Sequence, residues 1–269
     1  MWEDVVELRW LEHYVPWRTA HLWVADHPEV PVLLSVAYLV GVFSIKHAMR
    51  DRPAFELKTP LLLWNVLLAV FSLFGSLATV PHIIRVVRQH GITYDMCTFD
   101  SESMNPWILL FGLSKIPELL DTFFIVLRKR PLIFLHYYHH VVTLLYCWHG
   151  LGLQAPNGGW FAAMNLVIHT LMYAYYAACA YGVRFGVATR QSITTLQILQ
   201  MVLGIAIVVH NLVACNTLPT NYIFGLVMYV SYVVLFTKLY IDSYVKKANR
   251  RTKQPTTAAD PTRKTKKAD

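Results

Sequence analysis

Three histidines within one short apolar stretch are the residues of this chain best placed to do chemistry. His136, His139 and His140 stand at i, i+3 and i+4, so a helix would place their rings on one face. A neutral imidazole can attack an activated acyl group, and the acyl-imidazole that forms divides one difficult transfer into two easier steps. Imidazoles also bind metals, so the spacing alone leaves two kinds of chemistry open.

Other apolar stretches also contain polar residues at helical spacing. Ionisable groups within membrane-spanning helices are costly, and their usual explanation is function. Lys115, Glu118 and Asp121 are three residues apart, and the two carboxylates could orient imidazole rings and set their tautomers. Two later stretches contribute Asn165, His169, Met172, Tyr173, Tyr176, Thr194, Gln197 and Gln200. A buried ion pair, interhelical hydrogen bonds and ordinary packing are the simpler explanations for these residues taken singly.

The depth of these residues in their helices favours one shared site. With a rise of 1.5 Å per residue, the polar groups of all four stretches lie about 9–18 Å from the same end of their helices. Unrelated structural polar groups would not form such a layer. The sequence therefore predicts one chamber that several helices enclose, lined by water or by substrate.

Seven apolar stretches are long enough to cross the hydrocarbon core, which is about 30 Å thick. They cover residues 30–45, 60–84, 107–127, 132–153, 159–181, 191–213 and 221–243. We therefore expect an all-α membrane protein with seven transmembrane helices. Residues 1–29 would precede this body, which covers residues 30–245, and a basic tail would follow at residues 246–269.

The net charge of +8 is concentrated in the tail. Residues 246–269 alone carry +7, which leaves +1 for the rest of the chain and excludes a nucleic-acid-binding face on its body. Four cysteines are too few for a disulfide scaffold, and 13% aromatic residues are too many for a disordered chain. The start Met1-Trp2-Glu3-Asp4 is unlike a cleaved signal peptide.

Lysine and arginine alternate between the two sides of the predicted spans. Segments 46–58, 128–130 and 182–190 and the tail hold 18 of them, and the segments on the opposite side hold four. The excess belongs in the cytoplasm, so the N-terminus would be lumenal and the C-terminus cytosolic. Cys97 and Cys215 would then both be lumenal, where a disulfide between them is one hypothesis and two free thiols the other.

The tail from residue 246 is expected to be disordered, since it is basic and lacks apolar periodicity. Electrostatic adhesion to anionic lipid headgroups is the simplest role for it. Lys266 and Lys267 are followed by two final residues, which resembles the dilysine signal that returns membrane proteins to the endoplasmic reticulum.

Metal chemistry is the main alternative to a histidine nucleophile. An HxxHH pattern occurs in di-iron membrane desaturases and hydroxylases, where several such patterns together hold two irons. This chain has only one, although spacing leaves open a zinc site made of the trio with Asp121 or Glu118. A seven-span receptor shares the topology but has no need for the polar layer.

Four motifs resemble, in order and in placement, the signatures of the ELO very-long-chain fatty acid elongases. They are Lys115-Ile-Pro-Glu118-Leu-Leu-Asp121-Thr122, His136-Tyr-Tyr-His139-His140, His169-Thr-Leu-Met172-Tyr173-Ala-Tyr175-Tyr176 and Thr194-Thr-Leu-Gln197-Ile-Leu-Gln200. The resemblance implies seven helices, six of them enclosing an acyl tunnel as two inverted three-helix units. The stretch Leu132-Ile-Phe-Leu-His136 most resembles the branch that acts on saturated and monounsaturated chains, with polyunsaturated chains as the alternative.

The family's activity is condensation of acyl-CoA with malonyl-CoA at the endoplasmic reticulum, which gives 3-oxoacyl-CoA, carbon dioxide and CoA without a metal or another cofactor. The resemblance implies that His139 is the nucleophile, with His136, His140 and His169 beside it and Glu118 and Asp121 orienting them. Lys115, Asn165, Met172, Tyr173, Tyr176, Gln197 and Gln200 would meet substrate, and CoA phosphates would meet Arg128, Lys129, Arg130, Arg184, Arg190 or Lys246. A reductase, a dehydratase and an enoyl reductase are the expected partners, and the chain could form a homodimer or heterodimer.

Overall fold

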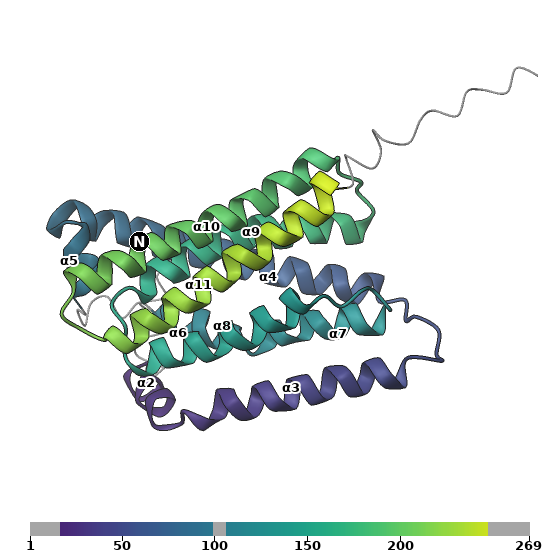
Figure 1. Cartoon of the computed structure of the whole chain (residues 1–269), viewed down its shortest axis with the longest axis horizontal. Coiled ribbons are helices and arrows are strands. Elements are labelled where there is room, and N and C mark those ends of the chain that lie inside the picture. The colour runs from purple at the N-terminus through teal and green to yellow at the C-terminus, as the bar shows by residue number, and fades with distance from the viewer. Residues whose placement is uncertain (1–16, 99–105, 247–269) are drawn as a thin grey trace, which may run out of the picture.

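The computed structural model describes residues 17–98 and 106–246, and this part of the chain is built from helices without a strand (Figure 1). The α-helices are α2 (Trp17–Asp26), α3 (Glu29–Ala48), α4 (Lys58–His90), α5 (Ile92–Cys97), α6 (Pro106–Ser114), α7 (Leu120–Leu127), α8 (Phe134–Gly152), α9 (Gly158–Tyr181), α10 (Val187–Ala214) and α11 (Pro219–Tyr240). A 3₁₀ turn, η3 (Pro117–Leu119), precedes α7, and a π-helical turn, η4 (Ile241–Val245), follows α11.

Helices lie at all the predicted apolar stretches, and four of them are long and apolar enough to span a membrane by length and composition. These are α3, α4, α10 and α11 together with η4. The chain is thus a multi-pass membrane protein with an all-helical body, and crossing by all seven stretches stays a prediction. Two short helices, α2 and α5, lie in segments that the sequence analysis left without structure.

The third apolar stretch is not one continuous helix as predicted. It is divided into α6, η3 and α7, and the division falls at Pro117. Proline has no backbone N–H and its ring crowds the preceding turn, so it kinks or interrupts an α-helix. At Pro117 the helix is interrupted by a 3₁₀ turn, whereas α4 continues through Pro81. The tighter 3₁₀ turn places residues three apart above one another, which keeps Lys115 and Glu118 on the same side.

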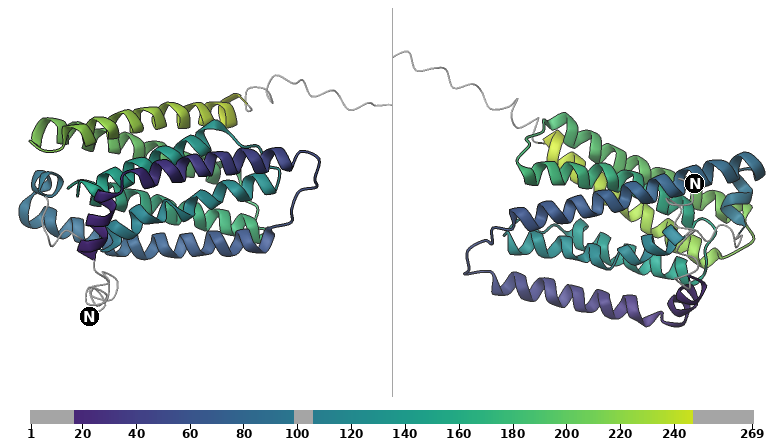
Figure 2. Two further views of the ribbon diagram at one scale, coloured as in Figure 1. Left: turned by 90° about the horizontal axis from the view of Figure 1, so that it is seen from below. Right: turned by 180° about the vertical axis from the view of Figure 1, so that it is seen from behind.

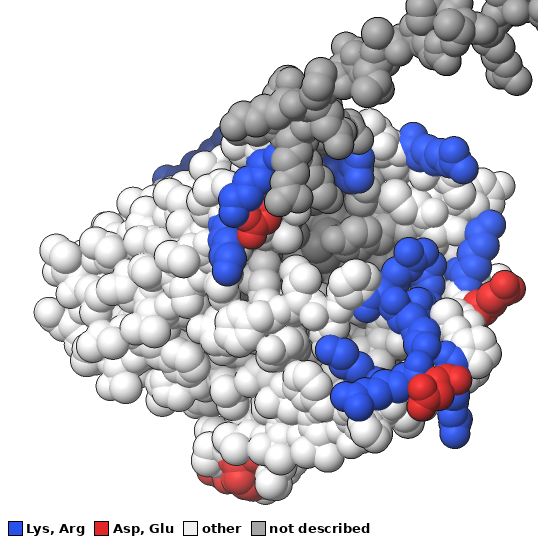
Figure 3. Space-filling model, turned by 45° about the vertical axis from the view of Figure 1, so that its right-hand side comes forward, with Lys and Arg blue, Asp and Glu red and all other residues white. Residues whose placement is uncertain are grey.

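The long helices run side by side between two ends of the bundle (Figures 1 and 2). We call the end with residues 49–57, 128–133 and 182–186 the basic end, because Lys and Arg side chains gather there (Figure 3). The end with residues 91–98, 153–157 and 215–218 is called the far end.

Glycine allows close packing between the helices that contact each other most extensively. The most extensive helix contacts are α4 with α9 and α10 with α11. A Cβ added at Gly75 of α4 would lie 2.8 Å from a methyl carbon of Leu166 in α9, and one added at Gly204 of α10 would lie 2.7 Å from the ring of Tyr229 in α11. Small residues allow helices to approach in this way in membranes, where packing drives association.

A disulfide between Cys97 and Cys215 joins the C-terminal residue of α5 to the segment before α11. The two Cα atoms are 5.2 Å apart, and the residues are separated by 118 positions in the chain. The link therefore closes a very long loop at the far end of the bundle.

Candidate functional site: two cavities that meet at a histidine

A cavity of about 360 Å³ lies toward the basic end, enclosed by side chains of α7 to α11. Apart from Lys115, its lining contains the residues that the sequence analysis expected to share a chamber: Glu118, Asp121, His136, His139, His140, Asn165, His169, Met172, Tyr173, Tyr176, Thr194, Gln197 and Gln200. The predicted layer is therefore a physical cavity, which we call the basic-end cavity.

The three histidines of α8 form a cluster in the wall of this cavity. The ring centroid of His140 lies 4.6 Å from that of His136 and 5.6 Å from that of His139. His139 also contacts Tyr232 of α11, whose hydroxyl donates a hydrogen bond to the His139 carbonyl oxygen at 3.1 Å. This contact ties the backbone at His139 to α11 and leaves the side chain facing the cavity.

Glu118 and Lys115 form a buried ion pair. The Lys115 ammonium donates to Glu118 Oε1 at 2.8 Å and to Asn165 Oδ1 at 3.1 Å, and the two side chains of the pair are 3% and 5% exposed. The Ser114 hydroxyl also donates to Oε1, and the other carboxylate oxygen lies 4.0 Å from His169 Nδ1. Lys115 lines neither cavity described here, and besides Glu118 and Asn165 its ammonium lies 4.2 Å from the centroid of the Phe111 ring.

Asp121 is held by two donors on other helices. The Trp64 indole N–H of α4 donates to Oδ1 at 2.6 Å, and the Tyr173 hydroxyl of α9 donates to Oδ2 at 2.8 Å. Both carboxylate oxygens thus accept strong hydrogen bonds, and neither bond involves a histidine. Sequence reasoning missed Trp64, since an indole in an apolar stretch is ordinary and its pairing depends on how α4 packs.

A row of hydrogen bonds connects His136 to two hydroxyl groups on other helices. Its Nε2 is 3.0 Å from the Thr122 hydroxyl, which in turn is 2.6 Å from the hydroxyl of Tyr38 in α3. The sequence signal for Thr122 was only its position beside Asp121, and Tyr38 had none. These hydrogen bonds connect α3, α7 and α8 beside the histidine cluster.

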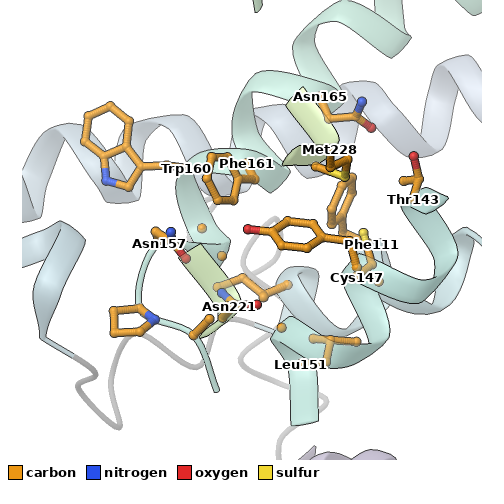
Figure 4. A pocket seen from close by; sticks show the side chains of 18 of the residues that line it. Phe111, Thr143, Cys147, Leu151, Asn157, Trp160, Phe161, Asn165, Asn221 and Met228 are labelled. Atoms are coloured by element: carbon orange, nitrogen blue, oxygen red, sulfur yellow. The ribbon is translucent and has the colours of Figure 1, made fainter. Parts of the chain in front are cut away.

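A smaller cavity of about 110 Å³ continues from the cluster toward the far end. Its lining shares His139, Asn165, Gln200 and Met201 with the basic-end cavity, so the two cavities meet at these residues. Figure 4 shows Thr143 and Asn165 toward one end of this far-end cavity and Asn157 and Asn221 toward the other. His139 therefore stands where the two cavities adjoin.

The basic residues proposed for CoA lie around the basic end. Arg190 lines the basic-end cavity. Lys129 donates to the Arg50 carbonyl oxygen at 2.9 Å, and Lys246 pairs with Asp242 at 2.6 Å. Arg130 and Arg184 are exposed and Arg128 is half-buried. Lys266 and Lys267 lie outside the described residues.

Asp95 of α5 is a polar group of the far-end cavity that sequence reasoning did not place. The Trp160 indole donates to its Oδ2 at 2.7 Å. Burial raises the pKa of Asp95, because it disfavours the charged carboxylate, and this effect exceeds the opposing effect of the Trp160 hydrogen bond.

Comparison with known proteins identifies the family of this chain. Residues 23–252 match the model of the ELO family, described as GNS1/SUR4. The chain is 38% identical to very long chain fatty acid elongase 6 of Homo sapiens over 241 residues, 86% of this chain and 90% of the relative. It is 36% identical to fatty acid elongase 3 of Trypanosoma cruzi over 287 aligned positions, 91% of this chain and 96% of the relative. With four ordered motifs around one cavity and this agreement along most of its length, the chain belongs to the ELO family.

Proposed function

We propose that this fatty acid elongase condenses an acyl-CoA with malonyl-CoA through an acyl group carried on His139. Membership of the family makes the chain an acyltransferase of the 3-oxoacyl-CoA synthase type. The observation that carries the proposal is the position of His139 where the two cavities adjoin. A thioester that enters from the basic end would meet the imidazole just as its chain enters the far-end cavity.

The reaction has two covalent steps. In the first, a ring nitrogen of neutral His139 attacks the thioester carbonyl, the bond from carbonyl carbon to sulfur breaks, and the ring N–H proton passes to the leaving CoA sulfur, which gives an acyl-imidazole and CoA thiol. In the second, malonyl-CoA loses carbon dioxide, and the enolate that forms attacks the acyl carbonyl. The bond from the carbonyl carbon to the His139 nitrogen breaks, the departing imidazole takes up one proton from solvent, and 3-oxoacyl-CoA is released.

Negative charge on the enolate oxygen has to be met by fixed donors. The Asn165 amide is one such group, since its oxygen is held by Lys115 and its nitrogen lies 3.2 Å from His169 Nε2. Tyr173 is a weaker candidate, because its hydroxyl already donates to Asp121. We assign Glu118 to positioning His169 and Asp121 to positioning Tyr173.

The direction of the substrate follows from charge and polarity. Arg190 at the basic-end cavity and the exposed cations around it would bind CoA phosphates, and the acyl chain would extend into the narrower far-end cavity. Gln197 and Gln200 of α10, with Met172 and Tyr176 of α9, would line the path of the thioester.

The membrane placement of this reaction is also a proposal. We infer a multi-pass protein of the endoplasmic reticulum with its basic end in the cytosol, where CoA esters are available, and its disulfide end in the lumen. Its 3-oxo product requires a reductase, a dehydratase and an enoyl reductase, which are the expected partners. We propose saturated and monounsaturated chains as substrates.

Incorporation of radiolabelled malonyl-CoA by the purified protein, with a chelator and no added metal or nicotinamide, tests the proposal. Wild type should form 3-oxoacyl-CoA, and His139→Ala should lose nearly all of this activity. After incubation with acyl-CoA alone, wild type should gain the mass of one acyl group, which peptide mapping should place on His139.

The matched control is His90→Ala, because His90 is exposed at the far end and lines neither cavity. It should elongate like wild type. Normal elongation by His139→Ala would contradict the nucleophile assignment, as would loss of wild-type activity upon chelation.

A further inference from the structure

Four buried polar side chains at the far-end cavity contain an atom without a hydrogen-bond partner among the described residues. They are His21, Tyr146, Asn157 and Asn221, and all four line this cavity. The Tyr146 hydroxyl and the Asn221 amide lie close enough to interact with each other, and His21 lies close to the backbone of Leu151, so of these four described residues Asn157 alone is without any partner. A buried polar group without a partner is costly, and native proteins rarely leave one unsatisfied. A cluster of them around one cavity therefore points to a ligand that makes hydrogen bonds.

Asn157 gives the strongest indication of a hydrogen-bonding ligand. Its side chain is fully buried, and neither its oxygen nor its nitrogen has a partner. The residue precedes α9, where an asparagine side chain often caps the helix, but it makes no such bond here. Its amide thus offers both a donor and an acceptor to the cavity.

Asn221 at the start of α11 is also fully buried, and its amide is oriented by His149. His149 Nδ1 lies 2.9 Å from Asn221 Oδ1, so the oxygen accepts from the imidazole and Nδ2 is left unpartnered. Nδ2 carries two hydrogens, of which the Tyr146 hydroxyl can accept one, so Asn221 still presents a donor to the cavity. With Asn157 supplying an acceptor, the pair matches a hydroxyl group, which accepts one hydrogen bond and donates another.

The distance of the two asparagines from His139 indicates which ligand could carry this hydroxyl group. Eleven positions separate His139 from Gly150 along α8, and the same number separates Tyr232 from Asn221 along α11, which is about 16 Å of helix. Between the two ends the lining is mostly apolar, with Phe111, Phe161 and Met228. A chain attached at His139 would run past these side chains and end at the two asparagines.

We propose that Asn157 and Asn221 form a binding site for a hydroxyl group at the far end of the acyl chain, so that the protein elongates ω-hydroxyacyl-CoA. The inference rests on the proposed acylation of His139. Asp95 also lines this cavity, so an ω-carboxylate would meet a like charge there. A water molecule has the same hydrogen-bonding chemistry, and the experiment separates these two sources.

Elongation is measured for methyl-ended, ω-hydroxy and ω-carboxy acyl-CoA over a series of chain lengths. At the length that reaches the asparagines, the ω-hydroxy chain should have a kcat/KM roughly tenfold above that of the methyl-ended chain, because it satisfies groups that a methyl leaves unpaired. Shorter ω-hydroxy chains should be poorer substrates than their methyl-ended counterparts, since their hydroxyl would stop among apolar side chains. The ω-carboxy chain should be the poorest at every length.

Asn157→Leu is the decisive variant, because leucine has a similar size and no polar atoms. It should abolish the preference for the ω-hydroxy chain and favour the methyl-ended one. Asn211→Leu is the matched control, since Asn211 is equally buried and its amide is also unpaired, but it lines neither the basic-end cavity nor the far-end cavity. Removing either unpaired amide should leave the fold intact, and only Asn157→Leu should alter the preference.

A binding measurement separates this proposal from the acylation of His139. Free ω-hydroxy fatty acid should raise the thermal unfolding midpoint of wild type more than the methyl-ended acid of equal length, and Asn157→Leu should remove the difference. Equal shifts for both acids, with equal kcat/KM values, would mean that water alone satisfies the asparagines and would overturn the proposal. Unequal shifts without any acyl adduct would retain the hydroxyl site and contradict only the proposed chemistry.

Discussion

The Trp64 indole nitrogen donates a 2.6 Å hydrogen bond to Asp121 Oδ1, and this bond connects α4 to α7 at the wall of the basic-end cavity. The other oxygen of the same carboxylate accepts from Tyr173 at 2.8 Å. Asp121 thus joins α4, α7 and α9 at one point, and its position determines where the Tyr173 hydroxyl lies beside His169.

Trp64→Phe should reduce kcat more than it changes KM. Phenylalanine keeps an aromatic ring against α7 but has no N–H, so Asp121 loses one of its two donors. A hydrogen bond to a charged group contributes about 1.5–3 kcal/mol, which corresponds to a roughly ten- to hundredfold change if it is fully expressed in the rate. Steady-state elongation kinetics measure this, and an unchanged kcat in a variant with normal thermal stability would contradict a positioning role.

Glu118→Gln should destabilise the protein and inactivate it. The substitution leaves the Lys115 ammonium buried without a counter-charge, and breaking a buried ion pair in this way costs about 3–5 kcal/mol. Thermal unfolding and elongation assays measure the two effects. The double variant Lys115→Met/Glu118→Leu should recover much of the stability without activity, and recovery of both would show that the pair is only structural.

Cys215→Ser should lower the free energy of unfolding by about 2–4 kcal/mol, since the disulfide closes a long loop. Cys179→Ser is the control, because Cys179 is a free, exposed cysteine. Thermal unfolding of both variants in non-reducing buffer measures the difference. Non-reducing peptide mapping should recover Cys97 and Cys215 in one linked fragment, and alkylation of both thiols without prior reduction would contradict the link.

Asp95→Asn should stabilise the protein at neutral pH and have little effect in acid. Because burial raises the pKa of Asp95 above its unfolded value, the folded state is disfavoured once the carboxylate ionises in the unfolded chain. Asparagine removes the charge and keeps an oxygen for the Trp160 indole. The gain in unfolding midpoint should therefore be absent near pH 3 and should grow as the pH rises toward neutrality.

The control for this pH dependence is Asp26→Asn, because Asp26 is exposed at the end of α2. Its midpoint should follow that of wild type at every pH. A gain from Asp95→Asn that is equal at pH 3 and pH 7 would exclude ionisation as its cause.

The sequence by itself determined the helical class, the apolar stretches and the polar layer. Hydrophobic length and the i, i+3, i+4 spacing of His136, His139 and His140 are local properties of the sequence. Because residues at this spacing lie on one face of any α-helix, the grouping of the three rings does not depend on tertiary packing. The cluster around His139 and the shared cavity could therefore be predicted. Hydrophobicity alone predicts one helix over the third stretch, whereas Pro117 divides it, because apolar length does not register a missing backbone N–H.

Only the tertiary structure decided which partners these residues have. Trp64 and Asp121 are 57 positions apart and Asn157 and Asn221 are 64, so their relations depend on how whole helices pack and not on any local pattern. Tyr38 and Thr122 meet for the same reason. Spacing places a side chain on a face of its helix, but the donor or acceptor opposite it comes from another helix whose rotation and depth are set by packing.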